Sequence, residues 1–367
     1  MSKLRVLVVD DSAVIRRMVR EVVAADPELE VAGVAANGKI ALAMVDQCTP
    51  DVVTMDIEMP EMDGLAALKE IRRSRPTLRV IMFSSLTERA ALATLDALAA
   101  GADDYVTKPS NVQSVSEGSE RIREQLIPKI KALCGRHPGH SVPVAPPRAP
   151  VFTKPAAQSS RVDIVVIGTS TGGPNALAEV LPRIPHNFPV PILIVQHMPP
   201  VFTAFLAERL RASAQIPIKE AVPRAPIEPG EAWIAPGDFH MTILRDGTHL
   251  RLAMNQLPPE NSCRPSVDVL FRSVAEIFGP RSLAVVLTGM GQDGLRGCER
   301  IHELGGQVVV QDEPSSVVWG MPGAVANAGI ADCVLPLSEI AEDIIHKTSI
   351  HRSPGQSVAA QIHGQVV

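Results

Sequence analysis

The segment Leu-Arg-Val-Leu-Val-Val-Asp-Asp-Ser at residues 4–12 sets the fold class of the first half of the chain. It begins with an apolar run of strand length, and residues 13–24 follow with apolar side chains at helical spacing. Further short apolar segments alternate with helical stretches at residues 31–34, 51–55, 79–83 and 105–106. Strict alternation of strands and helices predicts a doubly wound parallel sheet, whose ligands bind beyond the carboxyl ends of the strands.

Polar side chains stand at several of these strand ends. Asp10 and Asp11 follow the first strand, and Asp56 follows the third. Because these two strand ends lie side by side in a parallel sheet, the carboxylates would repel one another unless a hard cation such as Mg²⁺ joined them. Ser84 and Lys108 end the fourth and fifth strands, and a hydroxyl and an ammonium suit the oxygens of a transferred phosphoryl group. A helix cap would explain one of these residues, but not the whole set.

Four segments carry these residues: Val-Val-Asp-Asp-Ser, Thr-Met-Asp-Ile-Glu-Met-Pro-Glu-Met-Asp-Gly, Phe-Ser-Ser and Thr-Lys-Pro. Together they resemble the response-regulator receiver family over about residues 3–124. The resemblance implies that Asp56 accepts a phosphoryl group from a histidine kinase. The Mg²⁺ ligands that it implies are Asp10, Asp11, Asp56 and the backbone carbonyl of Glu58. The switch residues that it implies are the hydroxyl of Ser84, the rotating ring of Tyr105 and the phosphate-contacting Lys108.

The second half of the chain repeats the alternation, with strands expected at residues 163–167, 192–195, 232–235, 283–287 and 307–310. Ser170 follows the first of them in Val-Ile-Gly-Thr-Ser-Thr-Gly-Gly-Pro, before a helix expected at 175–181. Gly172 and Gly173 allow a tight turn there. The free N–H groups at the start of that helix could receive an oxyanion, so the segment favours a nucleophilic serine.

A nucleophilic serine needs a base and a group that orients the base. His197 ends the next strand, and Asp293 lies past the strand at 283–287, so both reach the same sheet edge as Ser170. A nucleotide-binding loop is the alternative, because such loops also join a strand to a helix through glycines. The glycines here do not follow G-x-G-x-x-G, and no ribose-binding acid ends the second strand. Spacing alone leaves both interpretations open.

Six segments of this half resemble one family: Gly-Thr-Ser-Thr-Gly-Gly-Pro, Val-Gln-His-Met-Pro, Ala-Pro-Gly-Asp-Phe-His-Met, Arg-Pro-Ser-Val-Asp-Val-Leu-Phe, Leu-Thr-Gly-Met-Gly-Gln-Asp-Gly and Gln-Asp-Glu-Pro-Ser-Ser. They are similar to the catalytic domain of chemotaxis-type protein-glutamate methylesterases, over about residues 162–347. The resemblance implies hydrolysis of glutamate methyl esters on methyl-accepting chemotaxis receptors, and deamidation of receptor glutamines, without a cofactor. The roles that it implies are nucleophile for Ser170, base for His197, orienting acid for Asp293, and oxyanion contacts for Met290 and Thr171. It leaves Arg264 and Asp312 open, for which a salt bridge or a turn cap is expected.

The sequence therefore predicts two α/β domains, a flavodoxin-like receiver at 1–124 and a Rossmann-like serine esterase at 161–347. A proline-rich linker is expected at 125–160 and a disordered tail at 348–367. A DNA-binding output domain is a rival for the second half. The net charge of −5 and the lack of a basic helix argue against it and against any nucleic-acid partner.

Two further expectations concern the surroundings of the protein. No apolar run reaches membrane-spanning length, so we expect no membrane insertion. The five cysteines are scattered and form no C-x-x-C pair. This spacing favours a cytoplasmic protein with neither disulfides nor metal-ligating cysteines.

Overall fold

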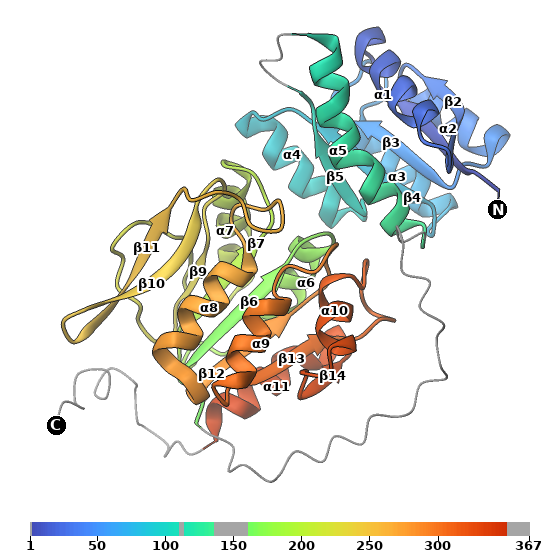
Figure 1. Ribbon diagram of the computed structural model, residues 1–367. Helices are drawn as coiled ribbons and strands as arrows, with labels where there is room; N and C mark the ends of the chain where they lie inside the picture. The colour runs from blue at the N-terminus through green and yellow to red at the C-terminus, as the bar shows by residue number, and fades with distance from the viewer. Residues whose placement is uncertain (1, 110–113, 136–160, 351–367) are drawn as a thin grey trace. The chain divides into compact units, whose positions relative to one another are not determined.

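The computed structural model describes residues 2–109, 114–135 and 161–350, which fall into two compact units. The first unit is a five-stranded parallel sheet with helices between the strands (Figure 1). Its strands lie in the order β2-β1-β3-β4-β5, which is the flavodoxin-like order. They are β1 (Leu4–Val9), β2 (Leu29–Ala35), β3 (Val52–Asp56), β4 (Arg79–Ser84) and β5 (Asp104–Thr107). The helices are α1 (Ala13–Ala25), α2 (Gly38–Cys48), α3 (Gly64–Ser74), α4 (Glu88–Ala99) and α5 (Val115–Leu133).

Local chemistry explains where these helices begin. Side-chain oxygens of Ser12, Asn37, Asp63 and Thr87 accept hydrogen bonds from backbone N–H groups in the first turns of α1 to α4. The central strand β3 is fully buried, so this part of the sheet is covered on both faces. The predicted α/β class and strand order of this unit are therefore confirmed.

The end of this unit differs from the prediction. A linker was expected from residue 125, but α5 continues to Leu133. Leu126, Ile130 and Leu133 are buried on its inner face, and this burial holds the helix together despite Pro128 within it. The predicted linker therefore starts too early, and its stretch from 136 to 160 lies outside the described residues.

The second unit is a seven-stranded parallel sheet in the order β14-β13-β12-β6-β7-β9-β8. The chain starts at the central β6, builds outward to one side and then returns to the other, as in Rossmann-like sheets. The strands are β6 (Ile164–Thr169), β7 (Ile192–Gln196), β8 (Ile218–Glu220), β9 (Ala232–Ile234), β12 (Ser282–Val286), β13 (Gln307–Gln311) and β14 (Cys333–Leu335). The helices are α6 (Gly173–Val180), α7 (Phe202–Ser213), α8 (Val267–Phe278), α9 (Leu295–Glu303), α10 (Met321–Asn327) and α11 (Leu337–Ser349), with short 3₁₀ turns at Leu181–Arg183 and Gly279–Arg281.

Several elements of this unit were not predicted. The edge strands β8 and β14 have three residues each, too few for a periodic pattern. The antiparallel hairpin of β10 (His240–Asp246) and β11 (His249–Asn255) forms a separate sheet, seen in yellow in Figure 1. The helix predicted at 175–181 begins earlier, at Gly173.

The remaining expectations concern the chain end and membranes. The predicted tail begins at 348, but α11 reaches Ser349, and residues 351–367 lie outside the description. Among the described residues, none of the helices combines the length and the hydropathy needed to cross a bilayer.

Candidate functional site

The predicted acidic cluster of the first unit is assembled at the ends of β1 and β3. Carboxylate oxygens of Asp10, Asp11 and Asp56 lie within 4.8 Å of one another. The ammonium of Lys108 joins them, with Nζ 2.9 Å from Asp10 Oδ2 and 2.8 Å from Asp56 Oδ1. Three carboxylates in one small volume form an oxygen-rich donor set that suits Mg²⁺.

Burial shifts the pKa values of the charged residues in this cluster. Asp10 and Asp56 are only 2% and 3% exposed. Burial raises the pKa of Asp56 to about 6, against the opposing hydrogen bond from Lys108, and it also raises the pKa of Asp10. Burial works against the charge of Lys108 too, but the two carboxylates outweigh it and raise the pKa of Lys108. A bound divalent cation would favour the charged forms of both aspartates.

The other predicted receiver residues surround this cluster. Ser84 is buried, and its hydroxyl accepts a hydrogen bond of 2.7 Å from Thr94 Oγ1 on α4. Tyr105 is buried beneath Lys129, whose Nζ lies 5.2 Å from the ring centroid. The Glu58 side chain is exposed and pairs with Arg89 at 3.2 Å. The roles of Ser84, Tyr105 and the Glu58 carbonyl stay predictions.

In the second unit, Ser170 lies on the turn between β6 and α6. Its N–H donates to Thr288 O at 3.1 Å, and its carbonyl accepts from Gly173 N at 2.8 Å. Gly172 makes this turn possible because its φ is +79°, a conformation that other residues adopt at a cost. Ser170 Oγ makes no hydrogen bond to any residue that the structure describes. The hydroxyl is thus held on a fixed turn with its reactive atom unpaired among those residues.

His197 and Asp293 meet at the same edge of the sheet. His197 N donates to Thr169 O at 3.1 Å, which fixes the end of β7 beside the end of β6. Nε2 of His197 lies 2.8 Å from Asp293 Oδ2. Since a carboxylate only accepts hydrogen bonds, Nε2 carries the proton. In the neutral ring, Nδ1 is therefore the unprotonated nitrogen.

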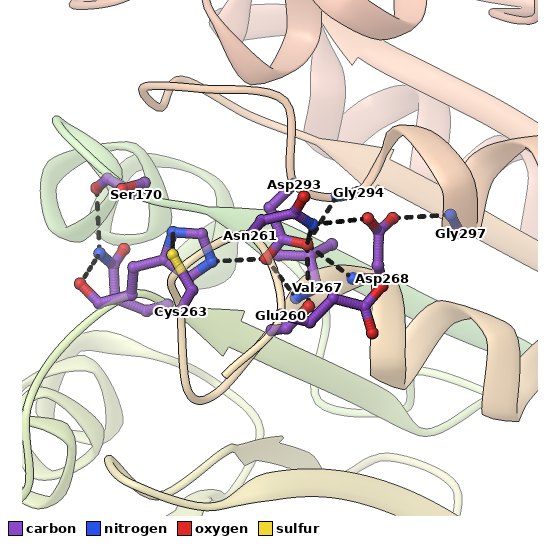
Figure 2. Close-up of polar contacts among 12 residues, drawn as sticks. Ser170, Glu260, Asn261, Cys263, Val267, Asp268, Asp293, Gly294 and Gly297 are labelled. Atoms are coloured by element: carbon purple, nitrogen blue, oxygen red, sulfur yellow. Dashed lines mark hydrogen bonds and ion pairs between the residues drawn. The ribbon is translucent and has the colours of Figure 1, made fainter. Parts of the chain in front are cut away.

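The carboxylate of Asp293 is held by a ring of donors, drawn in Figure 2. Asn261 Nδ2 donates to its Oδ1 at 2.9 Å, and Val267 N at the start of α8 donates to its Oδ2 at 2.7 Å. Its other donors are Ser266 Oγ, Asp268 N and Gly294 N. Burial alone would favour the neutral acid, but these donors and His197 outweigh it and lower the pKa of Asp293 far below its usual range.

An unpredicted thiol faces the other nitrogen of the histidine. Cys263 Sγ lies 3.6 Å from His197 Nδ1. Burial opposes the charged imidazolium, but the contacts with Asp293 and Cys263 outweigh it and raise the pKa of His197 above its ordinary value. No hydrogen bond joins Ser170 to His197 within the described ranges. The structure therefore places the predicted residues at one edge of the sheet, with Nδ1 of His197 facing Cys263. Their catalytic roles stay predictions.

The predicted oxyanion residues lie around the serine turn. A Cβ placed on Gly289 would stand 2.9 Å from Ser170 Cβ, so the loop after β12 passes directly against the serine. Met290 follows, and its N–H has no hydrogen-bond partner in the part of the chain described here. Thr171 is buried, and its carbonyl accepts from Thr288 Oγ1 at 2.9 Å. These positions are compatible with the oxyanion roles, which stay predictions.

The two residues with open roles have structural contacts. Arg264 Nε donates to Asp238 Oδ1 at 3.0 Å, which is the expected salt bridge. Asp312 Oδ1 accepts from Ser315 N at 3.1 Å, which is the expected turn cap.

Sequence reasoning missed three residues at this edge: Asn261, Cys263 and the buried Gln196. Gln196 Nε2 donates to the carbonyls of Ser170 at 3.0 Å and His197 at 3.3 Å, and so ties the two strand ends together. In the sequence, the position of Gln196 directly before His197 was the feature that could have indicated its place at the site. Asn261 lies in a loop where its φ is +53° and that of Ser262 is +61°, and no pattern in the sequence indicates this path.

The fold and these sites define a class: an aspartate-bearing receiver followed by a Rossmann-like domain with a serine-hydrolase-type edge. A family model described as CheB methylesterase matches residues 165–344, and one described as response regulator receiver domain matches residues 6–118. The chain belongs to the CheB methylesterase family.

Several relatives match nearly the whole chain. A protein-glutamate methylesterase/protein-glutamine glutaminase of Trichodesmium erythraeum is 53% identical over 95% of this chain and 99% of its own. A relative with the same name from Nocardioides sp. is 51% identical over 96% of this chain and 97% of its own. The crystal structure of the Thermotoga maritima CheB methylesterase catalytic domain is 42% identical, with a TM-score of 0.50, over 51% of this chain and 99% of that domain. These comparisons support the esterase interpretation rather than the DNA-binding or nucleotide-binding alternatives.

Proposed function

We propose that this protein hydrolyses γ-glutamyl methyl esters on methyl-accepting chemotaxis receptors and deamidates receptor glutamines, with Asp56 phosphorylation as the control. The 2.8 Å pair of His197 and Asp293 beside the Ser170 turn is the observation that carries the proposal. The names of the whole-length relatives support both activities.

In the proposed reaction, Ser170 Oγ attacks the ester carbonyl and gives its proton to His197. Since Nε2 is committed to Asp293, the accepting atom is Nδ1, and the thiol of Cys263 must yield that position to the serine. The N–H of Met290, with Thr171 as a second contributor, would receive the oxyanion. His197 then protonates the leaving methoxide, and water resolves the acyl-enzyme by the same route. With a glutamine substrate the leaving group is ammonia.

In the receiver unit, Asp56 would accept a phosphoryl group from a histidine kinase. Asp10, Asp11, Asp56 and the Glu58 carbonyl would hold Mg²⁺, which when bound supplies positive charge to the phosphoryl oxygens. Lys108 already contacts Asp56 and would pair with the phosphoryl group, with Ser84 and Tyr105 as the responding residues. A cytoplasmic location stays a prediction.

Methanol release from a methylated receptor tests the esterase proposal. Ser170→Ala should lose several orders of magnitude in turnover with the fold intact, because the turn keeps a small residue while the nucleophile is gone. Ser213→Ala, at the end of α7, is the matched control and should keep full activity, since among the described residues its hydroxyl hydrogen-bonds only to Leu210 O. Near-normal methanol release by a folded Ser170→Ala protein would overturn the assignment.

A further inference from the structure

We infer that His197 and Cys263 form a binding site for a thiophilic divalent cation, with Zn²⁺ as the fitting ion, and that its occupation switches the esterase off. The inhibitory half of this inference rests on the proposed role of His197 as the base. The metal-binding half rests only on the geometry of the two side chains.

The separation of the two atoms matches a zinc site. Cys263 Sγ and His197 Nδ1 are 3.6 Å apart. Bonds of about 2.3 Å to sulfur and about 2.05 Å to nitrogen, at a tetrahedral angle, place those two ligand atoms about 3.6 Å apart. One Zn²⁺ can therefore bridge the pair without changing their separation.

Asp293 supports such an ion from behind the histidine. Metal-ligating histidines commonly donate their other ring N–H to a carboxylate, which orients the ring and increases its basicity. Nε2 of His197 does so at 2.8 Å to Asp293 Oδ2. The oxygens of Asp293 are engaged by Asn261, Ser266 and backbone N–H groups, so this carboxylate acts through the ring rather than as a direct ligand.

Both ligand side chains are partly exposed. Cys263 is half-buried, and the His197 side chain is 12% exposed. Water would complete the tetrahedron, as in zinc sites that keep open positions. Thiolate and imidazole select zinc over magnesium, whereas the carboxylates of Asp10, Asp11 and Asp56 favour magnesium. The two metal preferences of the chain are thus chemically separate.

The binding step releases protons. Zn²⁺ binds the thiolate of Cys263, whose proton goes to solvent, and takes the lone pair of neutral His197 Nδ1. That lone pair is the one that would accept the proton of Ser170. A bound ion therefore blocks activation of the serine without touching it.

The experiment uses the untagged full-length protein in excess Mg²⁺, which keeps the acidic cluster occupied. Co²⁺ serves as the spectroscopic substitute for Zn²⁺, because a thiolate–cobalt bond gives a charge-transfer absorption band. The wild type should show this band at one Co²⁺ per chain, and Zn²⁺ should remove it. Cys263→Ala should lose the band and at least tenfold in Zn²⁺ affinity by calorimetry. Cys333→Ala, which removes another half-buried thiol, should keep both.

Methanol release then tests the inhibition, with each variant compared with its own metal-free rate. Zn²⁺ should reduce the wild-type rate at least tenfold, a chelator should restore it, and Cys263→Ala should need at least tenfold more Zn²⁺. Absence of the thiolate band in the wild type, or its survival in Cys263→Ala, would overturn the site. A bound ion with undiminished ester hydrolysis would instead contradict His197 as the base and the inhibition with it.

Discussion

At the scale of single residues, the carboxylate of Asp293 accepts most of the hydrogen bonds that hold the sheet edge around His197. It accepts hydrogen bonds from the side chains of His197, Asn261 and Ser266, and from the N–H groups that open α8. Both oxygens of Asp293 accept hydrogen bonds, which suits the ionised carboxylate because a protonated oxygen would have to donate one. The charge of Asp293 therefore sets both the orientation of the imidazole and its basicity.

Asp293→Asn should lower the turnover strongly, but by less than His197→Ala, because it misorients the base without deleting it. The charge that raises the pKa of His197 is also lost, so that pKa should fall. Since the neutral ring is the active form, the acidic limb of the pH–rate profile should move to lower pH in Asp293→Asn. Methanol release between pH 5 and 9 measures both effects. A larger loss in Asp293→Asn than in His197→Ala would show that the roles are wrongly distributed.

The acidic cluster gives a second prediction at this scale. Protons compete with Mg²⁺ for Asp56, whose pKa is about 6, so Mg²⁺ affinity should be about tenfold weaker at pH 5 than at pH 8. Titration calorimetry at the two pH values measures this difference. Asp56→Asn should bind Mg²⁺ weakly at both, while Asp46→Asn, on the exposed end of α2, should behave as the wild type. Equal wild-type affinity at pH 5 and pH 8 would contradict the proposed ligand.

At the scale of elements, a side chain joins the ends of β6 and β7 in addition to the backbone hydrogen bonds between the two strands. The amide of Gln196 donates to the carbonyls of Ser170 and His197, while its Oε1 is buried without a partner among the described residues. A buried oxygen without a hydrogen bond lowers the free energy of unfolding. The two hydrogen bonds from Nε2 offset part of this loss. Those contacts fix the register between the serine turn and the histidine.

Gln196→Met keeps the length of the side chain and removes the amide nitrogen that makes both hydrogen bonds. We expect kcat to fall about fivefold with little change in KM, because about 1 kcal/mol of positioning energy is lost and the contacts touch no substrate. Gln215→Met is the matched control, since in the part of the chain that the structure describes this exposed amide hydrogen-bonds only to Pro182 O. Steady-state methanol release measures both constants, and an effect confined to KM would argue against a positioning role.

The contribution of the last turns of α5 to the stability of the first unit can also be tested. A receiver fragment that stops at residue 124 lacks the buried Leu126, Ile130 and Leu133, each worth about 1.5–3 kcal/mol of burial. That loss is comparable with the whole stability of a small domain, so we expect this fragment to be largely unfolded. A fragment of residues 1–135 should unfold cooperatively in urea. Equal midpoints for the two fragments would show that the last turns of α5 contribute nothing.

At the scale of the whole molecule, the chain carries two parallel sheets, and each places its reactive side chains beyond the carboxyl ends of its strands. The proposed nucleophile Ser170 and the proposed phosphoryl acceptor Asp56 belong to separate units. Regulation then requires that phosphorylation of Asp56 alters the activity of Ser170 from a different folding unit.

A fragment beginning at Arg161 tests that coupling. If the unphosphorylated receiver restrains the enzyme, the fragment should release methanol faster than the full chain. A small-molecule phosphodonor with Mg²⁺ should accelerate the full chain and leave the fragment unchanged. The full chain carrying Asp56→Asn is the control and should ignore the phosphodonor. Equal rates for the fragment and the untreated full chain would exclude restraint by the receiver.

The sequence by itself determined the class of both sheets and the placement of Asp10, Asp56, Ser170, His197 and Asp293 at their edges. The physical reason is simple: parallel strands end at one edge, so a residue that directly follows a strand has its place set by local sequence. The two sets of motifs, one in each half of the chain, were also sufficient to indicate the family.

Only the tertiary structure decided what surrounds those residues. Cys263 reaches Nδ1 of His197, and Asn261 reaches Asp293, through a loop with two left-handed residues that no periodicity encodes. The end of α5 was likewise set by burial against its own sheet rather than by its proline. Contacts between residues far apart in sequence depend on side-chain packing and loop path, and a local pattern carries neither.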